Sequence, residues 1–114
     1  MKLSPCVPEL PVRDVEIAQA YYRDQLGFKI EWLYPGAEIG AVSRGDCALF
    51  LRRTAGPLRT GTCWIFADDV DAAYADFEAR AANIVEPIAD KPWGLRQFTV
   101  EDLHGNRFHI HHDL

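Results

Sequence analysis

The chain has 114 residues, of which 48% are hydrophobic and 25% charged, and its formal net charge is −5. This composition is ordinary for a globular protein, and the length predicts a single domain spanning residues 1–114. The acidic balance argues against a nucleic-acid partner, because phosphate backbones are bound by clustered lysine and arginine. No apolar run approaches the length of a membrane span, so no membrane partner is expected.

Three cysteines are present, Cys6, Cys47 and Cys63. Their odd number and the lack of a Cys-x-x-Cys pair argue against a disulfide framework and against a zinc knuckle. Each lies in an apolar run and is predicted to be a buried free thiol. The N-terminal stretch MKLSPCVPEL lacks the long apolar segment of a secretion signal, so a cytoplasmic location is expected.

The first half of the chain predicts one helix among four strands. A strand is expected in CVPELPV (6–12), followed by a helix with Asp14 as its N-cap and Gly27 as its C-terminal stop. Four apolar residues recur on one face of this helix: Val15, Ala18, Tyr22 and Leu26. Three more strands are expected at 28–34, 38–43 and 47–51.

The second half repeats this order when the sequence is shifted by 55 positions, which brings Asp69 onto Asp14. The apolar helix face is then Val70, Ala73, Phe77 and Ala81, and strands are expected at 62–67, 83–88, 95–101 and 107–112. The segment 52–61, rich in Gly, Pro and Arg, is typical of a solvated linker. We therefore predict an α+β fold of two βαβββ modules, about 1–55 and 60–114, with their sheets curved around a shared cleft.

Three stretches carry a family resemblance: RDV…YYRDQLGF, DDVDAAYADFEA and EDLHGNRFHI. With the βαβββ repeat, they resemble the vicinal oxygen chelate superfamily, which includes glyoxalase I, extradiol dioxygenases, fosfomycin-resistance enzymes and bleomycin-resistance proteins. The resemblance covers essentially the whole chain. It implies the fold, but not the function, because this fold serves both metal enzymes and metal-free binding proteins.

The resemblance also gives the positions where the enzymes of this group hold their metal. In this sequence those positions are Val7, Thr62 and His109. Valine has no donor atom and a neutral threonine hydroxyl is a poor ligand for a transition metal, so only one donor is left. An alternative metal site would use Glu9, His109 and His111. The competing interpretation is that the C-terminal histidines are ordinary solvated side chains.

Within the superfamily, the chain is most similar to the bleomycin-resistance proteins. CVPELPVRDVEIAQAYYRDQLGF, GDCALFL and KPWGLRQFTVEDLHGNRFHI resemble their N-terminal region, fourth strand and C-terminal motif. The resemblance implies a homodimer in which the first strand crosses to the partner subunit at Pro8. It also implies a binding site for a planar aromatic drug, formed around Trp32, Trp64 and Trp93. Glu38, Phe50 and His109 are the further candidate ligand-binding residues.

The resulting hypothesis is stoichiometric, metal-free sequestration of a bleomycin-like antibiotic, with no cofactor and no catalytic residue. Stacking between tryptophan rings suits a flat ligand, whereas the competing interpretation places these rings in the core. The alternative function is a metal-dependent lyase, isomerase or dioxygenase, and a third is binding of an unrelated metabolite. Charges near the cleft are ambiguous: the acidic candidates are Glu31, Glu38, Glu101 and Asp102, and the basic ones Arg52, Arg53 and Arg59.

Overall fold

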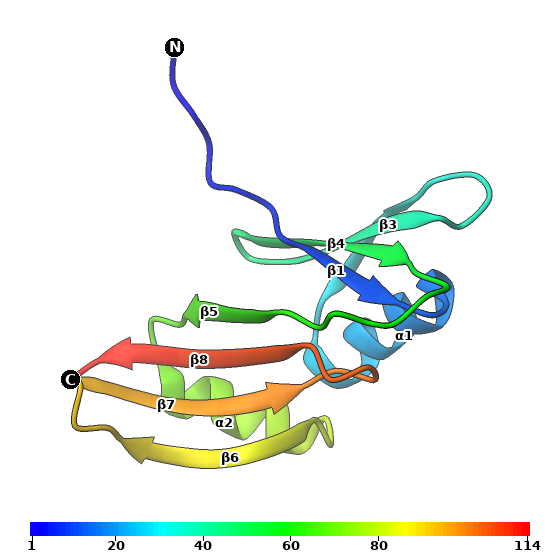
Figure 1. Cartoon of the computed structure of the whole chain (residues 1–114). Coiled ribbons are helices and arrows are strands. Elements are labelled where there is room, and N and C mark those ends of the chain that lie inside the picture. The colour runs from blue at the N-terminus through cyan, green and yellow to red at the C-terminus, as the bar shows by residue number, and fades with distance from the viewer.

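The computed structural model describes residues 1–114 and contains the predicted repeat of two βαβββ modules (Figure 1). The first module consists of β1 (Glu9–Val12), α1 (Val15–Leu26), β2 (Lys29–Leu33), β3 (Ile39–Arg44) and β4 (Cys47–Arg53). The second consists of β5 (Thr62–Phe66), α2 (Val70–Ala79), β6 (Asn83–Asp90), β7 (Leu95–Glu101) and β8 (Arg107–Asp113). The strand and helix order predicted from the sequence is confirmed.

Each module forms one four-stranded sheet, with the order β1-β4-β3-β2 in sheet A and β5-β8-β7-β6 in sheet B. The first strand of each module runs parallel to the last one, and all other neighbours are antiparallel. Helix α1 packs on sheet A and α2 packs on sheet B. Each sheet therefore has one face in the core and one face turned away from its helix.

The two helices begin in the same way because each has an aspartate N-cap. The Asp14 carboxylate accepts a hydrogen bond from the backbone N–H of Ile17 at 2.9 Å, and Asp69 accepts from Ala72 at 3.0 Å. Their ends differ. Gly27 closes α1 in the left-handed conformation (φ 72°), whereas α2 ends at Ala79. The prediction that Ala81 extends the apolar face of α2 is wrong, since Ala81 is exposed beyond the helix.

One hydrophobic core joins the two modules. The Tyr22 ring of α1 meets the edge of Phe108 of β8, with ring centroids 6.1 Å apart. Beside this contact the Asp102 carboxylate is buried and accepts hydrogen bonds from Tyr22 Oη, His104 N and Asn106. Asp102 was considered as an acidic group near the cleft; this is wrong, because it belongs to the junction between modules.

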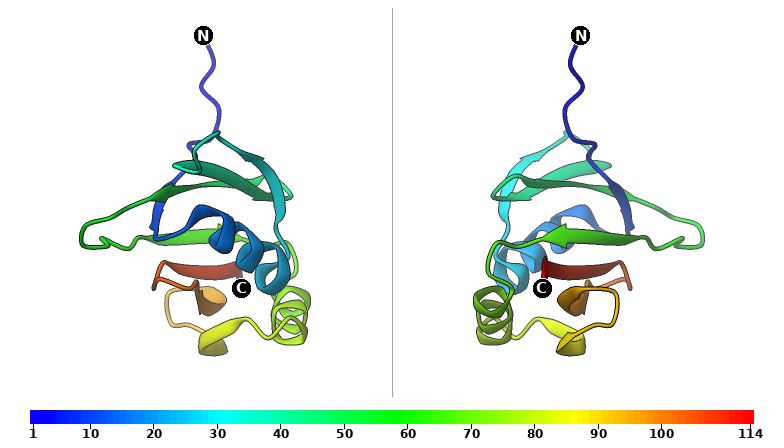
Figure 2. Two further views of the ribbon diagram at one scale, coloured as in Figure 1. Left: turned by 90° about the vertical axis from the view of Figure 1, so that its right-hand side faces the viewer. Right: turned by 90° about the vertical axis from the view of Figure 1, so that its left-hand side faces the viewer.

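The N-terminal segment is extended and exposed over residues 1–7, and it projects away from the two sheets in each view (Figures 1 and 2). Cys6 lies on this segment and is exposed, so its prediction as a buried thiol is wrong. Cys47 and Cys63 are half-buried, and burial raises the pKa of both thiols. Neither helix is long and apolar enough to cross a membrane.

Candidate functional site

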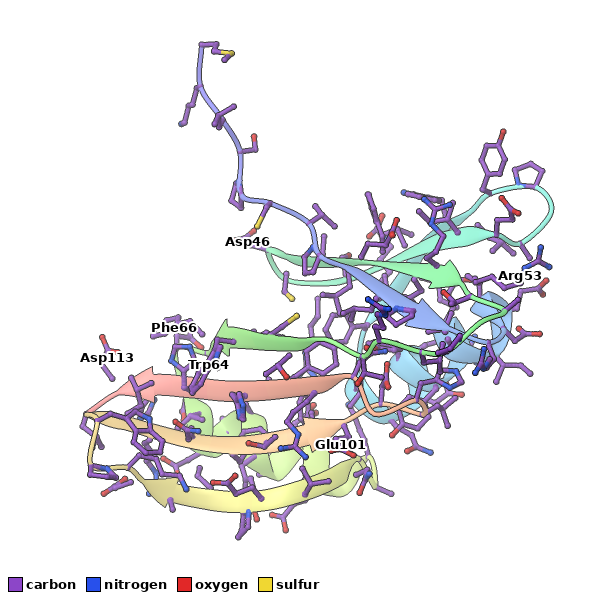
Figure 3. All side chains as sticks on the ribbon, viewed as in Figure 1. Asp46, Arg53, Trp64, Phe66, Glu101 and Asp113 are labelled. Atoms are coloured by element: carbon purple, nitrogen blue, oxygen red, sulfur yellow. The ribbon has the colours of Figure 1, made fainter.

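The outer face of sheet B carries a row of exposed aromatic side chains. Along β5, Cys63 and Ile65 turn toward the core, so that Trp64 and Phe66 point outward and are 53% and 61% exposed. Figure 3 shows both labelled side chains at the end of β5, next to β8. His109 of β8 pairs with Trp64 in the strand register and projects to the same face.

The rings on this face touch one another. The centroid of Trp64 lies 4.3 Å from that of His109, at an interplanar angle of 37°. The His111 ring meets the edges of Trp64 at 5.7 Å and of Phe66 at 6.0 Å. Together with Trp93, these rings form what we call the sheet B platform (Trp64, Phe66, Trp93, His109 and His111). Such a surface offers π-faces to a flat ligand.

Two polar residues of β7 lie on the platform side of the sheet. Gln97 and Thr99 flank Phe98, which faces the core, and they pair with His111 and His109 in the register. Both are buried, with 2% and 0% of their surface exposed. The Gln97 Oε1 accepts a hydrogen bond from Trp93 Nε1 at 2.9 Å, and Thr99 Oγ1 lies 2.7 Å from His109 Nδ1.

Trp93 is carried by the tight turn between β6 and β7. Gly94 has a φ of 87°, a conformation that favours glycine. Its carbonyl accepts a hydrogen bond from the backbone N–H of Leu114 at 3.0 Å, so the C-terminal residue holds this turn. The Lys91 Nζ lies 5.9 Å from the Trp93 ring centroid and is paired with Glu86. The ring is 59% exposed.

A second, smaller aromatic pair lies on the outer face of sheet A. The Trp32 ring meets Phe50 with centroids 5.3 Å apart. Trp32 turns outward because β2 has a bulge between Ile30 and Trp32, which reverses the alternation of side chains. The bulge is held by α1, since Gln19 Nε2 donates to the Trp32 carbonyl at 2.8 Å. Gln19 is 3% exposed.

The remaining residues expected at the site lie on sheet A. Glu38 is exposed at the start of β3, with its carboxylate 3.6 Å from the guanidinium of Arg53. The Pro8 carbonyl accepts a hydrogen bond from Phe50 N at 2.9 Å within the same chain. Glu31 accepts from Ser43 Oγ at 2.7 Å. The predicted site residues thus form two groups on two different sheets.

A cavity of about 670 Å³ opens along the seam between the two modules. Its wall includes Leu26, Phe28, Phe66 and Phe77, and its rim includes Arg44. None of the three tryptophans lines it. All three are exposed, Trp32 by 43%, so the competing interpretation that they fill the core is wrong.

Two titratable groups have a shifted pKa here, His109 on the platform and Glu86 at its edge. Burial lowers the pKa of His109, against the opposing effect of the Glu86 carboxylate. The hydrogen bond from Lys91 lowers the pKa of Glu86. At neutral pH the platform therefore presents the neutral imidazole of His109, and the Glu86–Lys91 salt bridge lies at its edge.

The chain matches one known protein family over nearly its whole length. Residues 2–110 match the model of the glyoxalase/bleomycin resistance protein/dioxygenase superfamily. The chain belongs to this superfamily. Among curated proteins, none matches its sequence.

Solved structures of the superfamily share this fold. The crystal structure of TioX from Micromonospora sp. ML1 is 28% identical with a TM-score of 0.83, covering 97% of this chain and 100% of that one. The bleomycin-binding protein of Streptomyces verticillus, complexed with copper(II)-bleomycin, is 28% identical with a TM-score of 0.79, covering 96% of each chain. Lactoylglutathione lyase from Agrobacterium tumefaciens, 22% identical with a TM-score of 0.74 over 97% of this chain and 95% of that one, shares the fold alone.

The three positions that hold the metal ligands in superfamily enzymes do not supply a set of metal-binding side chains in this chain. Val7 lies on the exposed N-terminal segment, and Thr62 begins β5. The alternative ligand Glu9 is on sheet A, where its carboxylate pairs with Arg52 at 3.0 Å, whereas His109 and His111 are on sheet B. No group of three His, Cys, Asp or Glu side chains is arranged to hold a metal ion.

Four residues of the site, Phe66, Gln97, Thr99 and Gln19, are not among those predicted from the sequence. Phe66 follows from strict alternation in TCWIF, and Gln97 and Thr99 follow from alternation in LRQFTVE. No sequence pattern points to Gln19, because its role depends on the bulge in β2, to which it donates a hydrogen bond from α1. The interpretation of the C-terminal histidines as ordinary solvated side chains does not hold for His112, whose Nδ1 accepts a hydrogen bond from Val70 N at the start of α2.

Proposed function

We propose that this protein binds and sequesters a planar aromatic antibiotic of the bleomycin type, without transforming it and without a metal ion of its own. The observation that carries the proposal is the contact between the rings of Trp64, which is 53% exposed, and half-buried His109 on the outer face of sheet B, with centroids 4.3 Å apart. Neither ring belongs to the hydrophobic core, and an aromatic surface of this kind matches the π-faces of a flat ligand.

The site is proposed to be completed by a second copy of the chain. One chain has two aromatic faces, the Trp32–Phe50 pair on sheet A and the sheet B platform, and neither is covered. In a homodimer, sheet A of one copy would lie opposite sheet B of its partner and enclose a ligand between tryptophans. The exposed N-terminal segment, which ends at Pro8, is proposed to cross to the partner subunit.

The comparisons support this function at the level of the family. The bleomycin-binding protein of Streptomyces verticillus is 28% identical to this chain over nearly its full length. Charge agrees with the proposal, since a chain of net charge −5 attracts a cationic ligand. Glu38 and Phe50 are proposed contacts on sheet A, and His109, Trp64 and Trp93 are proposed contacts on sheet B.

The test is a titration with bleomycin, followed by tryptophan fluorescence and by calorimetry. We expect quenching and a stoichiometry of one drug per chain. Trp93→Ala should weaken binding roughly 5- to 150-fold, since stacking on one aromatic ring is worth about 1–3 kcal/mol. The matched control is Ile17→Ala on the exposed face of α1, where an apolar side chain is also 62% exposed. Lack of binding at high micromolar drug would refute the proposal.

The alternative, a metal-dependent enzyme, is tested separately. Metal analysis of the untagged protein is combined with the variant His109→Ala. Stoichiometric metal in the native protein that is lost in this variant would favour the enzyme. We expect no such stoichiometric, His109-dependent metal, because Glu9 is paired with Arg52 away from both histidines.

A further inference from the structure

Gln97 and Thr99 are unusual because they are polar, almost fully buried and adjacent to the exposed ring of Trp93 and the half-buried ring of His109. They occupy alternate positions on β7 and each has one hydrogen-bond partner among the platform rings. A buried polar side chain that makes a hydrogen bond resists displacement, because breaking the bond leaves an unsatisfied group. Each residue can therefore fix the ring to which it is bonded.

The first contact acts on Trp93. This ring is on a turn and is 59% exposed, so few packing contacts restrain it. Its indole Nε1–H donates to Gln97 Oε1 at 2.9 Å, whereas no hydrogen bond joins the indole N–H of Trp32 or Trp64 to the chain. Gln97 therefore supplies a restraint on Trp93 that the other two tryptophans lack.

The second contact acts on His109. Thr99 Oγ1 has no other side-chain or backbone partner, and its hydroxyl hydrogen needs an acceptor. A neutral imidazole accepts at Nδ1 only when its proton is on Nε2. Nε2 of His109 makes no hydrogen bond within the chain and is not among the buried unpaired atoms, so its N–H can donate to a ligand. Thr99 thus selects the tautomer of the ring on which Trp64 stacks.

We propose that Gln97 and Thr99 are positioning residues of the sheet B platform, Gln97 fixing the indole of Trp93 and Thr99 fixing the ring and tautomer of His109. The platform is then preformed, and it offers one N–H donor to a ring nitrogen or carbonyl oxygen of a flat ligand. Preformed rings cost less ordering on binding and so favour affinity. The effect on ligand binding rests on the proposed function, but the positioning itself does not.

The positioning is tested first on the unmodified protein without ligand. In ¹H–¹⁵N spectra, each of the three indole N–H groups gives one signal, assigned by single Trp→Phe variants. We expect the Trp93 signal to exchange with solvent at least about tenfold more slowly than those of Trp32 and Trp64. Equal exchange rates would overturn the role of Gln97. Long-range ¹H–¹⁵N spectra should show a protonated Nε2 and an unprotonated Nδ1 for His109; the opposite tautomer would overturn the role of Thr99.

Two matched pairs of variants test the same groups. Gln97→Met removes the acceptor at similar volume and should accelerate Trp93 N–H exchange, whereas Gln97→Glu retains an acceptor and should preserve protection. Thr99→Val removes the hydroxyl and should change the His109 tautomer, whereas Thr99→Ser should keep it. If Thr99→Val and Thr99→Ser change the His109 tautomer equally, the hydroxyl is not responsible and the proposal fails for Thr99.

Bleomycin provides the functional readout. Gln97→Met should weaken drug binding roughly three- to tenfold, the equivalent of one hydrogen bond. In a Trp93→Phe background the same change should have almost no effect, because its action passes through Trp93. If the losses of affinity caused by Gln97→Met and by Trp93→Phe simply add in the double variant, the positioning role of Gln97 is overturned. If the drug does not bind at all while the exchange and tautomer results hold, the proposed function fails and the positioning stands.

Discussion

The hydroxyl of Tyr22 donates a 2.6 Å hydrogen bond to Oδ2 of Asp102, joining α1 of the first module to the end of β7 in the second. Both side chains are buried, with 1% and 5% of their surface exposed. Burial and the Asp102 carboxylate raise the pKa of Tyr22 well above its ordinary value, so the phenol stays protonated. The contact links the two halves through a satisfied polar pair inside one hydrophobic core.

Replacement of Tyr22 by Phe should therefore destabilise the whole chain. The aromatic contacts with Phe28 and Phe108 survive, but the buried carboxylate loses one of its donors. We expect the free energy of unfolding in urea to fall by about 1–3 kcal/mol. Tyr21→Phe is the matched control, since its hydroxyl reaches the Glu101 carbonyl at 3.3 Å from a half-buried position. An equal loss in both variants would contradict a special role for the pair.

The contact between α1 and the bulge in β2 leads to a prediction about the ligand site. Gln19→Leu removes the donor to the Trp32 carbonyl and should let Trp32 shift from the outer face of sheet A. Bleomycin affinity should then fall several-fold and stability by about 1 kcal/mol. Gln25→Leu makes the same chemical change on the same helix at a half-buried position without this hydrogen bond, and it should alter neither the affinity nor the stability. Calorimetry and urea unfolding provide the two measurements.

The order of helices and strands was predictable from the sequence, whereas the placement of Trp32 and Asp102 was not, for reasons that differ between the two residues. Hydrophobic periodicity and the aspartate caps placed both helices, and the family resemblance pointed to Trp64, whose exposure follows from the alternation of side chains along β5. The same alternation puts Trp32 on the core side, opposite Glu31, and only the bulge brings it out. Asp102 looked like a surface carboxylate because nothing local reveals Tyr22, which is 80 residues away in the chain.

The lowered pKa of His109 predicts the direction in which stability depends on pH. The folded protein binds fewer protons than the unfolded chain between the lowered value and the ordinary 6.5. The contribution of His109 to stability is thus complete above pH 6.5 and is lost as the pH falls toward the lowered value. Urea unfolding at pH 7.5, 6.5 and 5.5 should show this decline, and His109→Gln should make it shallower. If the free energy of unfolding declines with pH as steeply in His109→Gln as in the native protein, other titratable groups cause the decline.

The N-terminal segment leads to the last prediction, which concerns assembly. Leu3 is 80% exposed and Val7 is 39% exposed, and a single chain provides no cover for either. If residues 1–7 cross to a partner at Pro8, their deletion should weaken the dimer of 12.9 kDa chains. It should also lower bleomycin affinity, because each proposed site needs sheet A of one copy and sheet B of the other.

Analytical ultracentrifugation at several concentrations measures this directly. Replacing Leu3 and Val7 together by Ser should reproduce the loss at unchanged length, since burial of these apolar side chains drives the association. Replacing Lys2 and Ser4 by Ala is the matched control and should leave the dimer intact. A native chain that sediments as a monomer at micromolar concentration would remove the proposed composite site, and the drug would then have to bind the sheet B platform alone.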